Sequence, residues 1–364
     1  MINPVRKLIV KYNNDTVGYL AELDGGETAF QYDGGWVQNG FPISPFSLPL
    51  SGQVYINKEK TFKGVYGVFN DSLPDGWGEL LVKKTLAKKG INYDRLSPLT
   101  KLTLISGNGL GALTYEPHQL EETGIAGYSL DEIAREAKTV LEDDDGEAAD
   151  FDKIFQLGGS SGGARPKAHI KDDGEYWIVK FPCKLDTADI GKQEYAANAL
   201  AKECGVNVND FKLFKSALCP GYFGAKRFDR DEGKRIHTVS LAALLETTHR
   251  VPNLDYIHLF QVIQNICVDK GDMLEAYKRM CFNVLYGNRD DHGKNHAFIY
   301  DEKIDGYQLS PAYDLTKTPY KPEHEMTVNG NGKPSEKDLL DAAKTMKLSV
   351  EKCKKIISEI KKRL

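Results

Sequence analysis

Asp290, Asn295 and Asp314 carry side chains whose types and spacing fit the transfer of a phosphoryl group. Asp290 and Asn295 lie five residues apart in the polar segment GNRDDHGKN, residues 287–295. In phosphoryl transfer an aspartate can accept the proton of the attacking hydroxyl, and an asparagine five residues further on can bind magnesium. Asp314 follows a short predicted strand and can supply a second oxygen ligand, since magnesium prefers carboxylate, amide and phosphate oxygens. The spacing predicts ATP and magnesium as cofactors, with Asp290 as the base.

The same polar segment leaves other interpretations open. Asp291 is a rival base, and the five-residue spacing to Asn295 is what favours Asp290. His292 and Lys294 are further candidates for contact with the nucleotide. A metal-dependent hydrolase built on Asp290, Asp291 and His292 would need more ligands at metal-binding spacing, and the other histidines are scattered. A polar turn that only caps its neighbours is the non-catalytic alternative.

A lysine further upstream stands in an apolar run. Lys180 lies within YWIVKFP, which reads as a strand. A lysine buried on a strand is costly unless an anion pairs with it. An ATP phosphate would supply that anion, together with Glu194 in the first turn of the next predicted helix. The alternative is a surface lysine that buries only its aliphatic stem.

Two segments flank this lysine. LGGSSGGARPKA, residues 157–168, has glycines whose backbone can approach a phosphate, although it lacks the spacing of a P-loop. Its candidate phosphate contacts are Ser160, Gly162, Gly163, Arg165 and Lys167, and Ser160 and Ser161 are hydroxyls that a kinase could modify. In AKRFDR, residues 225–230, the backbone of Lys226, Arg227 and Phe228 could bind an adenine edge. A strand that only connects two lobes would need no ligand.

The elements that must position these residues differ along the chain. The first 115 or so residues are mainly β, with strands predicted at 7–12, 17–23 and 54–56 and a helix at 80–89 that Gly90 ends. Ser129 and Glu132 form a capping box for a helix that extends to about Leu141. The acidic segment EDDDGEAAD, residues 142–150, then marks a domain boundary.

The second half changes from strands to helices. Strands are predicted in KAHI, EYWIVKF and GYFGAKRF within residues 151–230, interrupted by one helix at 192–204. Helices follow at 254–269, 273–286, 336–346 and 350–364, with a capping box at Ser335 and Asp338. Strands followed by helices indicate an α+β fold in separate lobes, not a doubly wound parallel sheet.

Composition excludes several classes of protein. The 364 residues carry a net charge of −4, which gives no overall electrostatic case for binding nucleic acid or a membrane. No run reaches the 18 or more apolar residues of a membrane span, and the N-terminus does not read as a signal peptide, so we expect a cytoplasmic protein. The six cysteines form no CxxC pair, which argues against a zinc site and favours reduced thiols.

The order of these motifs resembles the HipA-type serine/threonine kinases, the toxin components of bacterial toxin–antitoxin systems. The resemblance covers nearly the whole chain. It begins with VFNDSLPDGWGELLV and SPLTKLTLISGNGLGALTYEP, and continues through GGSSGGARPKA, WIVKFP, KRFDR, GNRDDHGKNHAF and LSPAYDL. DSLPDGWG and the DxHxKN core, residues 290–295, are its most specific motifs.

The resemblance implies a domain layout and a role for each site residue. The layout is an N-terminal subdomain at 1–118, a helix and acidic linker at 119–150, and a kinase-like domain at 151–364. That domain has a β lobe at about 151–230 and a helical lobe at about 231–364, with ATP and magnesium between them. The implied roles are Asp290 as catalytic base, Lys180 on the nucleotide phosphates, Asn295 and Asp314 on magnesium, and residues 226–228 on adenine.

The resemblance also implies regulation and partners. The regulatory serine falls on Ser160, in a loop that family members phosphorylate on themselves, and Ser161 is a second candidate. The expected partner is a HipB-like helix-turn-helix antitoxin, so contact with DNA would be indirect, and the protein substrate would belong to translation. A weakly catalytic module that mainly binds the antitoxin, and a small-molecule or lipid kinase, remain as alternatives.

Overall fold

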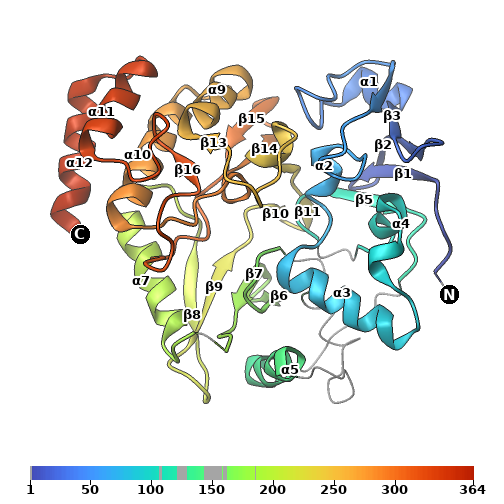
Figure 1. Cartoon of the computed structure of the whole chain (residues 1–364), viewed down its shortest axis with the longest axis horizontal. Coiled ribbons are helices and arrows are strands. Elements are labelled where there is room, and N and C mark those ends of the chain that lie inside the picture. Colours follow the sequence, from blue (N-terminus) through green and yellow to red (C-terminus); the bar gives the residue numbers. More distant parts are fainter. Residues whose placement is uncertain (1, 106–108, 121–128, 143–157, 159–161, 185) are drawn as a thin grey trace. The chain divides into compact units, whose positions relative to one another are not determined.

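The computed structural model describes residues 2–105, 109–120, 129–142, 158, 162–184 and 186–364. These residues form two compact units, Met1–Lys192 with Phe211–His237 and Gln193–Asp210 with Thr238–Leu364. Figure 1 labels their helices and strands. The acidic segment at 143–150 lies outside the described residues. The predicted division at 118 and 150 therefore stays a prediction.

The first unit contains a five-stranded antiparallel sheet. Its spatial order is β4-β3-β2-β1-β5. The strands are β1 (Lys7–Tyr12), β2 (Asp15–Glu22), β3 (Thr28–Tyr32), β4 (Val54–Asn57) and β5 (Leu113–Glu116). Side chains alternate between the two faces of a strand, so Leu8, Val10 and Tyr12 all point into the core.

Helices accompany this sheet in the described part of the N-terminal segment. They are α1 (Gly34–Asn39), α2 (Gly67–Asn70), α3 (Gly76–Lys88), the 3-10 turn η1 (Tyr93–Arg95) and α4 (Pro98–Leu102). On α3, the side chains of Trp77, Leu81 and Val82 are buried in one cluster with Tyr93. This cluster fixes the start of α3, which contains the last residues of the DSLPDGWG motif.

A second sheet of the first unit carries Lys180. It is antiparallel in the order β6-β7-β9-β8. The strands are β6 (Lys167–Asp172), β7 (Glu175–Lys180), β8 (Phe211–Phe214) and β9 (Tyr222–Lys226), followed by the hairpin β10 (Arg230–Asp231) and β11 (Lys234–Arg235). The register pairs Lys167 with Lys180 and Trp177 with Lys226.

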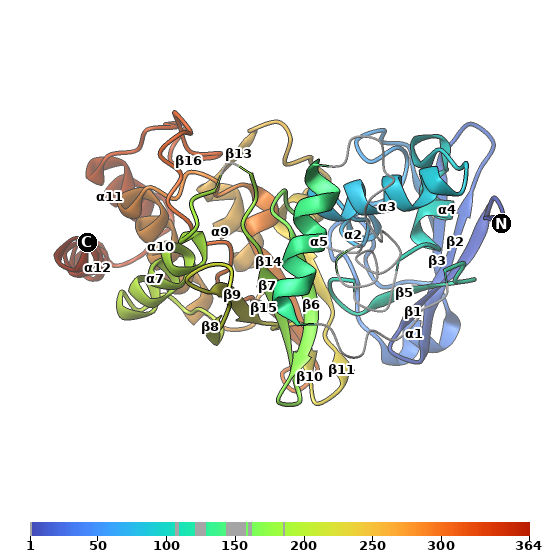
Figure 2. The same cartoon turned by 90° about the horizontal axis from the view of Figure 1, so that it is seen from below.

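Helix α5 (Leu130–Glu142) joins the two cores of the first unit. Ala137 and Val140 pack into the α3 cluster with Trp77. Ile133, on the same apolar stripe, packs with Trp177 and the other buried side chains of the second sheet. Figure 2 shows α5 running beside β6 and β7. The helix was predicted from the sequence, and the structure shows that its apolar stripe packs against both cores.

The second unit is mainly helical. It contains most of α7 (Ile190–Glu203), then α8 (Leu241–Leu244), α9 (Tyr256–Ile266), α10 (Gly271–Tyr286), α11 (Glu336–Thr345) and α12 (Val350–Arg363). Helix α10 packs on α9 and α12, and α11 packs on α12, as Figure 1 shows.

Short strands complete this unit. One sheet has the order β12-β14-β15, and a separate parallel pair joins β13 to β16. Their bounds are β12 (Thr238–Ser240), β13 (Leu254–Asp255), β14 (Ala297–Asp301), β15 (Gly306–Leu309) and β16 (Met326–Thr327). The α+β class predicted from the sequence is confirmed by this mixture of antiparallel sheets and packed helices.

Predicted helix ends were mostly close to those observed. Both capping boxes are present, at Ser129 with Glu132 and at Ser335 with Asp338. The helix predicted from residue 254 begins instead at Tyr256, because Asp255 caps it and the two residues before it pair with β16. Strands β3 and β8 were not predicted at all.

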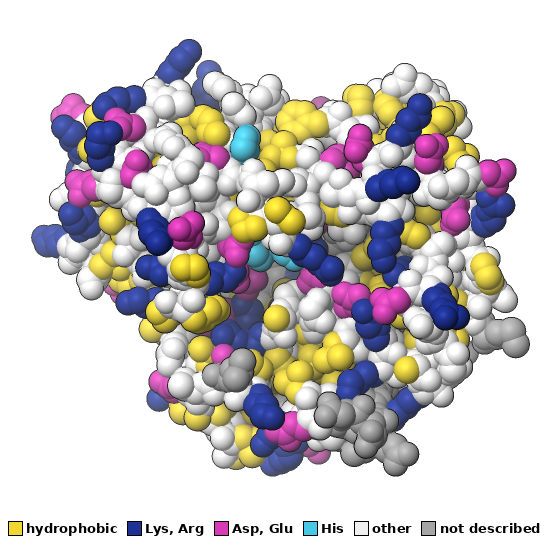
Figure 3. Space-filling view, in the orientation of Figure 1, with side chains coloured by type: hydrophobic (Ala, Val, Ile, Leu, Met, Phe, Trp, Pro, Cys, Tyr) yellow, Lys and Arg dark blue, Asp and Glu magenta, His cyan; other side chains and the backbone are white. Residues whose placement is uncertain are grey.

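The distribution of charged side chains and the hydropathy of the helices are consistent with the composition of the sequence. Figure 3 shows side chains of both charge signs interspersed over the visible face. Among the described residues, none of the helices is both long and apolar enough to cross a membrane.

Candidate active site

The polar segment 287–295 lies between α10 and β14 in the second unit. Gly287 caps the C-terminus of α10, and the 3-10 turn η2 (Gly293–Asn295) leads into β14. A Cβ at position 293 would lie 2.6 Å from Cδ1 of Leu254 and 3.2 Å from Cβ of Ala242. A larger residue there would displace the Leu254 side chain and press on Ala242, because the turn packs closely against both.

The structure brings Asp290 and Asn295 together. Nδ2 of Asn295 donates to the backbone carbonyl of Asp290 at 2.7 Å, a hydrogen bond that fixes the turn and does not use Oδ1 of Asn295. The Asp290 side chain is 37% exposed, and its Oδ1 lies 2.7 Å from Nζ of Lys321. Asp290 is thus an accessible carboxylate on a loop that its predicted partner holds in place.

Asp291, the rival base, has a different environment. Its side chain is completely buried, and its oxygens lie 2.8 Å from the hydroxyl of Tyr256 and 2.9 Å from Nδ1 of His324. The backbone N–H of Glu325 donates to it at 3.0 Å. A carboxylate surrounded by buried donors anchors the fold and cannot reach a substrate hydroxyl. The geometry favours Asp290 as the base and weakens the hydrolase interpretation, which needs Asp291 as a ligand.

The donors to Asp291 belong to a buried polar network. Burial, with the charge of Asp291, raises the pKa of Tyr256 well above its usual value, so its hydroxyl stays a donor. That hydroxyl in turn accepts from Nδ2 of Asn283 at 2.9 Å, and Nδ2 of Asn288 donates to Oδ1 of Asn283 at 3.0 Å. The network ties α9 and α10 to the loop that carries Asp290.

Asp314 follows β15 and approaches the same loop through its neighbour. The hydroxyl of Tyr313 donates to the carbonyl of Lys294 at 2.6 Å. Asp314 itself has φ of 53°, in the left-handed region that is uncommon for residues other than glycine. Aspartate adopts this conformation more readily than most residues, so the φ value alone assigns no role to Asp314. Asp314 remains the predicted second magnesium ligand.

His292 and Lys294, the other candidates in this loop, are half-buried. The ring of His292 lies 5.1 Å from the ring of His249 at 45°. The carbonyl of Lys294 is occupied by Tyr313. Their predicted contact with the nucleotide stays a prediction.

Lys321, which was not predicted as a site residue, lies beside Asp290. Nζ of Lys321 lies between Oδ1 of Asp290 at 2.7 Å and Oε1 of Glu325 at 2.6 Å. Burial would lower the pKa of Lys321, but hydrogen bonds to the two carboxylates outweigh it and raise the pKa, so the ammonium is charged. No motif marks this lysine, since its partner Asp290 lies 31 positions earlier in a different loop.

The nucleotide-binding candidates Lys180 and Glu194 fall in different units. Lys180 ends β7 in the first unit, with Nζ 5.8 Å from the ring centre of Phe223. Glu194 is 2% exposed on α7, within the second unit. Their ion pair stays a prediction.

In the predicted adenine-binding stretch, the side chain of Arg227 is buried and makes its hydrogen bonds within the protein. It makes a buried bidentate pair with Asp229, at 2.8 and 2.7 Å, and also contacts Nδ1 of His169 at 3.1 Å. Its backbone N–H donates to the carbonyl of Tyr176. Lys226 is paired with Glu175 at 2.8 Å. Backbone atoms of Lys226 and Phe228 remain the candidates for reading adenine.

Asp229 links this stretch to the N-terminal part of the first unit. Burial alone would raise its pKa, but the guanidinium groups of Arg227 and Arg230 and the N–H of Gly111 hold that pKa well below its usual value. The Gly111 N–H donates to Asp229 at 2.6 Å, and the carbonyl of Gly109 accepts from Arg227 and Arg230, each at 2.8 Å. The carboxylate is therefore ionised and fully paired.

Part of the glycine-rich segment is held by the DSLPDGWG motif. The N–H of Gly163 donates to the carboxylate of Asp75, and its carbonyl accepts from the N–H of Trp77 at 2.8 Å. Nζ of Lys167 donates to the carbonyl of Gly162. We refer to residues 75–77 as the Asp75–Trp77 clamp. Ser160 and Ser161, the predicted phosphorylation sites, lie outside the described residues.

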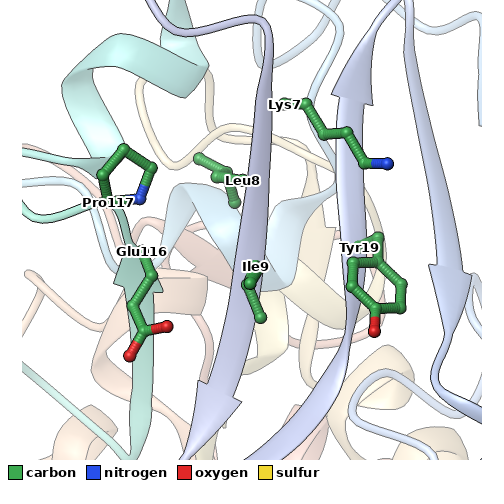
Figure 4. A pocket seen from close by; sticks show the side chains of 6 residues that line it. All are labelled: Lys7, Leu8, Ile9, Tyr19, Glu116 and Pro117. Carbon is green, nitrogen blue, oxygen red and sulfur yellow. The ribbon is translucent and has the colours of Figure 1, made fainter.

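A surface pocket of about 660 Å³ lies elsewhere in the first unit. Figure 4 shows that its lining residues come from β1, β2 and the end of β5, and they are Lys7, Leu8, Ile9, Tyr19, Glu116 and Pro117. None of the residues predicted to carry chemistry lines it.

Comparison with known proteins supplies the family. The sequence matches the HipA-like C-terminal domain over residues 159–364, more than half of the chain, and the HipA N-terminal domain over residues 8–116. The chain belongs to the HipA-like family. The resemblance inferred from DSLPDGWG and the DxHxKN core is thereby confirmed.

Relatives of this HipA-like chain are named as kinases. A putative kinase, Y4dM, of Sinorhizobium fredii is 30% identical over 40% of this chain, and the match spans 39% of that relative's length. The serine/threonine-protein kinase toxin HipA of Shewanella oneidensis is 26% identical, over 82% of this chain and 73% of the relative. A structure of Shewanella oneidensis HipA with HipB and its operator DNA has a TM-score of 0.72 at 18% identity, covering 98% of this chain and 88% of that one. At that identity the match supports the fold.

The donor set fits magnesium better than a softer metal. Asn295 and Asp314 offer an amide oxygen and a carboxylate, which are hard ligands. Among the described residues, no three His, Cys, Asp or Glu side chains are grouped to hold a metal. Magnesium needs no such group, because it keeps several waters and binds substrate phosphates alongside one or two protein oxygens.

Proposed function

We propose that this chain is an ATP- and magnesium-dependent serine/threonine protein kinase, acting as the toxin of a HipA/HipB-like toxin–antitoxin system. The observation that carries the proposal is the contrast between two adjacent acids. Asp291 is buried and fully hydrogen-bonded, whereas Asp290 is accessible on a loop fixed by Asn295. The kinase names of the relatives support the same reaction.

In this reaction Asp290 takes the proton of an acceptor hydroxyl. The hydroxyl oxygen forms a bond to the γ-phosphorus of ATP, the bond from that phosphorus to the bridging oxygen breaks, and the electron pair leaves with ADP. Asn295 and Asp314 would hold magnesium, which neutralises charge on the phosphates when it is bound. Lys180 would contact the phosphates, and the backbone near Phe228 would bind adenine.

The proposal predicts a loss of transfer when the base is removed. Incubation of the wild type with ATP and magnesium should yield phosphoserine or phosphothreonine, on the protein itself or on an added protein. Asp290→Asn should lower the transfer rate by about 10²–10⁴-fold, since a general base contributes a factor of that size. Phosphopeptide mass spectrometry and single-turnover kinetics would measure it.

A matched control separates loss of the base from loss of surface charge. Glu323 is an exposed acid in the same region, paired with Lys333 at 3.5 Å. Glu323→Gln should transfer phosphate at the wild-type rate. Equal transfer by wild type and Asp290→Asn would overturn the assignment of the base. No magnesium-dependent ATP affinity in the wild type would favour the alternative of a non-catalytic module.

The partners belong to the same proposal. The similar Shewanella oneidensis fold was solved with HipB and its operator DNA. A HipB-like helix-turn-helix antitoxin is therefore the proposed partner, a protein of translation the proposed class of substrate, and the cytoplasm the proposed location. Phosphorylation at Ser160 or Ser161 would be detected as a phosphopeptide that is absent from Asp290→Asn and from the doubly substituted Ser160→Ala, Ser161→Ala chain.

A further inference from the structure

Lys321 occupies a bridging position between two carboxylates at the proposed site. Its ammonium lies 2.7 Å from Oδ1 of Asp290 and 2.6 Å from Oε1 of Glu325. All three side chains are partly buried, with Lys321 25%, Asp290 37% and Glu325 20% exposed. An isolated surface pair contributes little, but a partly buried group of three charges is held more firmly.

The backbone around Lys321 is bonded to the loop that carries Asp290. Nη1 of Arg289 donates to the carbonyl of Lys321 at 2.5 Å, and the N–H of Arg289 donates to Oγ1 of Thr318 at 2.7 Å. On the other side of Lys321, the N–H of Glu325 donates to the carbonyl of Arg289 at 3.2 Å and to buried Asp291 at 3.0 Å. The position of the ammonium is thus set by the fold.

The two oxygens of Asp290 are consequently unlike. Oδ1 is bound to Lys321, and the described part of the chain places no hydrogen bond or ion pair on Oδ2. A general base must present one oxygen at hydrogen-bonding distance from the hydroxyl that it deprotonates. A carboxylate fixed through one oxygen presents the other in a defined direction.

We propose that Lys321 is a positioning residue for Asp290, which it holds through Oδ1 so that Oδ2 faces the acceptor hydroxyl. The proposal rests on the proposed kinase function. Glu325 has a part in it, because Asp290 becomes neutral when it accepts the proton and then attracts the ammonium less. Glu325 keeps Lys321 in place until the proton leaves.

The test compares variants of the full chain in single-turnover transfer from magnesium-ATP. Lys321→Met keeps an unbranched side chain one atom shorter and removes the charge, and it should lower the rate constant about 10–100-fold, as misplacement of a reacting group by about 1 Å does. The KM for ATP should change less than about threefold. Lys321→Arg should recover most of the rate. Lys333→Met, at an exposed lysine also paired with a glutamate, should behave as wild type.

A double-substitution cycle shows whether Lys321 acts through Asp290. In chains that already carry Asp290→Asn, adding Lys321→Met should leave the residual rate unchanged, since the positioned group is gone. A further decrease by the same factor as in the wild type would show an independent effect and overturn the proposal. Wild-type transfer by Lys321→Met would overturn it as well and leave the kinase assignment intact.

A second measurement does not depend on activity. If Lys321 holds Asp290, Lys321→Met should lower the unfolding midpoint more in the wild type than in Asp290→Asn. Equal shifts in the two backgrounds would show that the pair is not formed, and the proposal would fail. Absence of transfer in the wild type with unequal shifts would reject the kinase function and retain the pairing.

Discussion

Two consecutive aspartates in the polar loop differ in role: Asp291 stabilises the fold, and Asp290 is the proposed base. Asp291→Ala should leave the hydroxyl of Tyr256 and the ring of His324 without their shared acceptor inside the protein. We expect it to lower the free energy of unfolding by about 2–4 kcal/mol, because buried donors lose their partner. Asp290→Asn should cost less than about 1 kcal/mol. Urea denaturation of both variants measures the difference, and a similar cost for the two would contradict these environments.

A buried histidine in the first unit predicts sensitivity to acid. Burial lowers the pKa of His237 from 6.5 to about 4, although a hydrogen bond to the carbonyl of Ile43 at 2.8 Å opposes the change. Between those two values the unfolded chain binds the proton and the folded chain does not. Stability contributed by the neutral ring is therefore complete above about pH 6.5 and is lost as the pH falls toward 4.

The size of this effect follows from the shift. A decrease of roughly 2.5 pKa units corresponds to about 3 kcal/mol. His237→Gln can still donate to Ile43 and does not titrate. We expect the difference in unfolding free energy between pH 7 and pH 4.5 to be about 2–3 kcal/mol larger in the wild type than in this variant. The same difference in both would show that His237 is not the responsible group.

At the scale of elements, the Asp75–Trp77 clamp gives the DSLPDGWG motif a physical role. Gly76 has φ of 48°, and a Cβ there would lie 2.4 Å from the carbonyl oxygen of Gly163. Any other residue at position 76 must move the glycine-rich segment or give up the start of α3. The motif therefore fixes a segment that lies about 90 positions later in the chain and is proposed to contact phosphates.

Two glycines separate backbone strain from this steric effect. Gly90 has φ of 71° and open space where a Cβ would lie. Both Gly76→Ala and Gly90→Ala should suffer about 1 kcal/mol of left-handed strain. Only Gly76→Ala should cost a further 1–2 kcal/mol or so by overpacking, and only this variant should weaken binding of magnesium-ATP. Denaturation measures the stability of both variants, and calorimetric titration measures their affinity for magnesium-ATP. Equal stability and equal affinity of the two variants would show that the Asp75–Trp77 clamp has no such effect.

What the sequence predicted well was local. Capping pairs such as Ser335 with Asp338, and the helix end at Gly90, depend on residues a few positions apart. Strand β8 (Phe211–Phe214) was missed because it is short and is stabilised by pairing with β9, which its own four residues do not reveal. Lys321 was missed for a related reason, since an ion pair between two loops produces no motif or regular spacing in the sequence. The spacing of Asp290 and Asn295 was found because it is contained in one turn.

At the scale of the whole molecule, the N-terminal sheet and the β6–β9 sheet depend on each other. The carbonyls of Gly109 and Gly111 accept from Arg227, Arg230 and Arg235. Nδ2 of Asn13 donates to the carbonyl of Arg235 at 3.1 Å. The strand β7, with Trp177, therefore belongs to a unit that contacts with the first 118 residues also stabilise. The proposed domain layout treats those residues as a separate subdomain.

A fragment of residues 119–364 tests this dependence. Its Arg227 would lose the carbonyl of Gly109 and Asp229 would lose the N–H of Gly111, which leaves buried charges short of partners. The apolar face of α5 that packs on α3, including Val140, would be exposed to water. We expect the fragment to aggregate or to lack a cooperative thermal transition in near-ultraviolet circular dichroism. A monomeric fragment that unfolds cooperatively and binds magnesium-ATP like the full chain would show that the kinase-like part is self-sufficient.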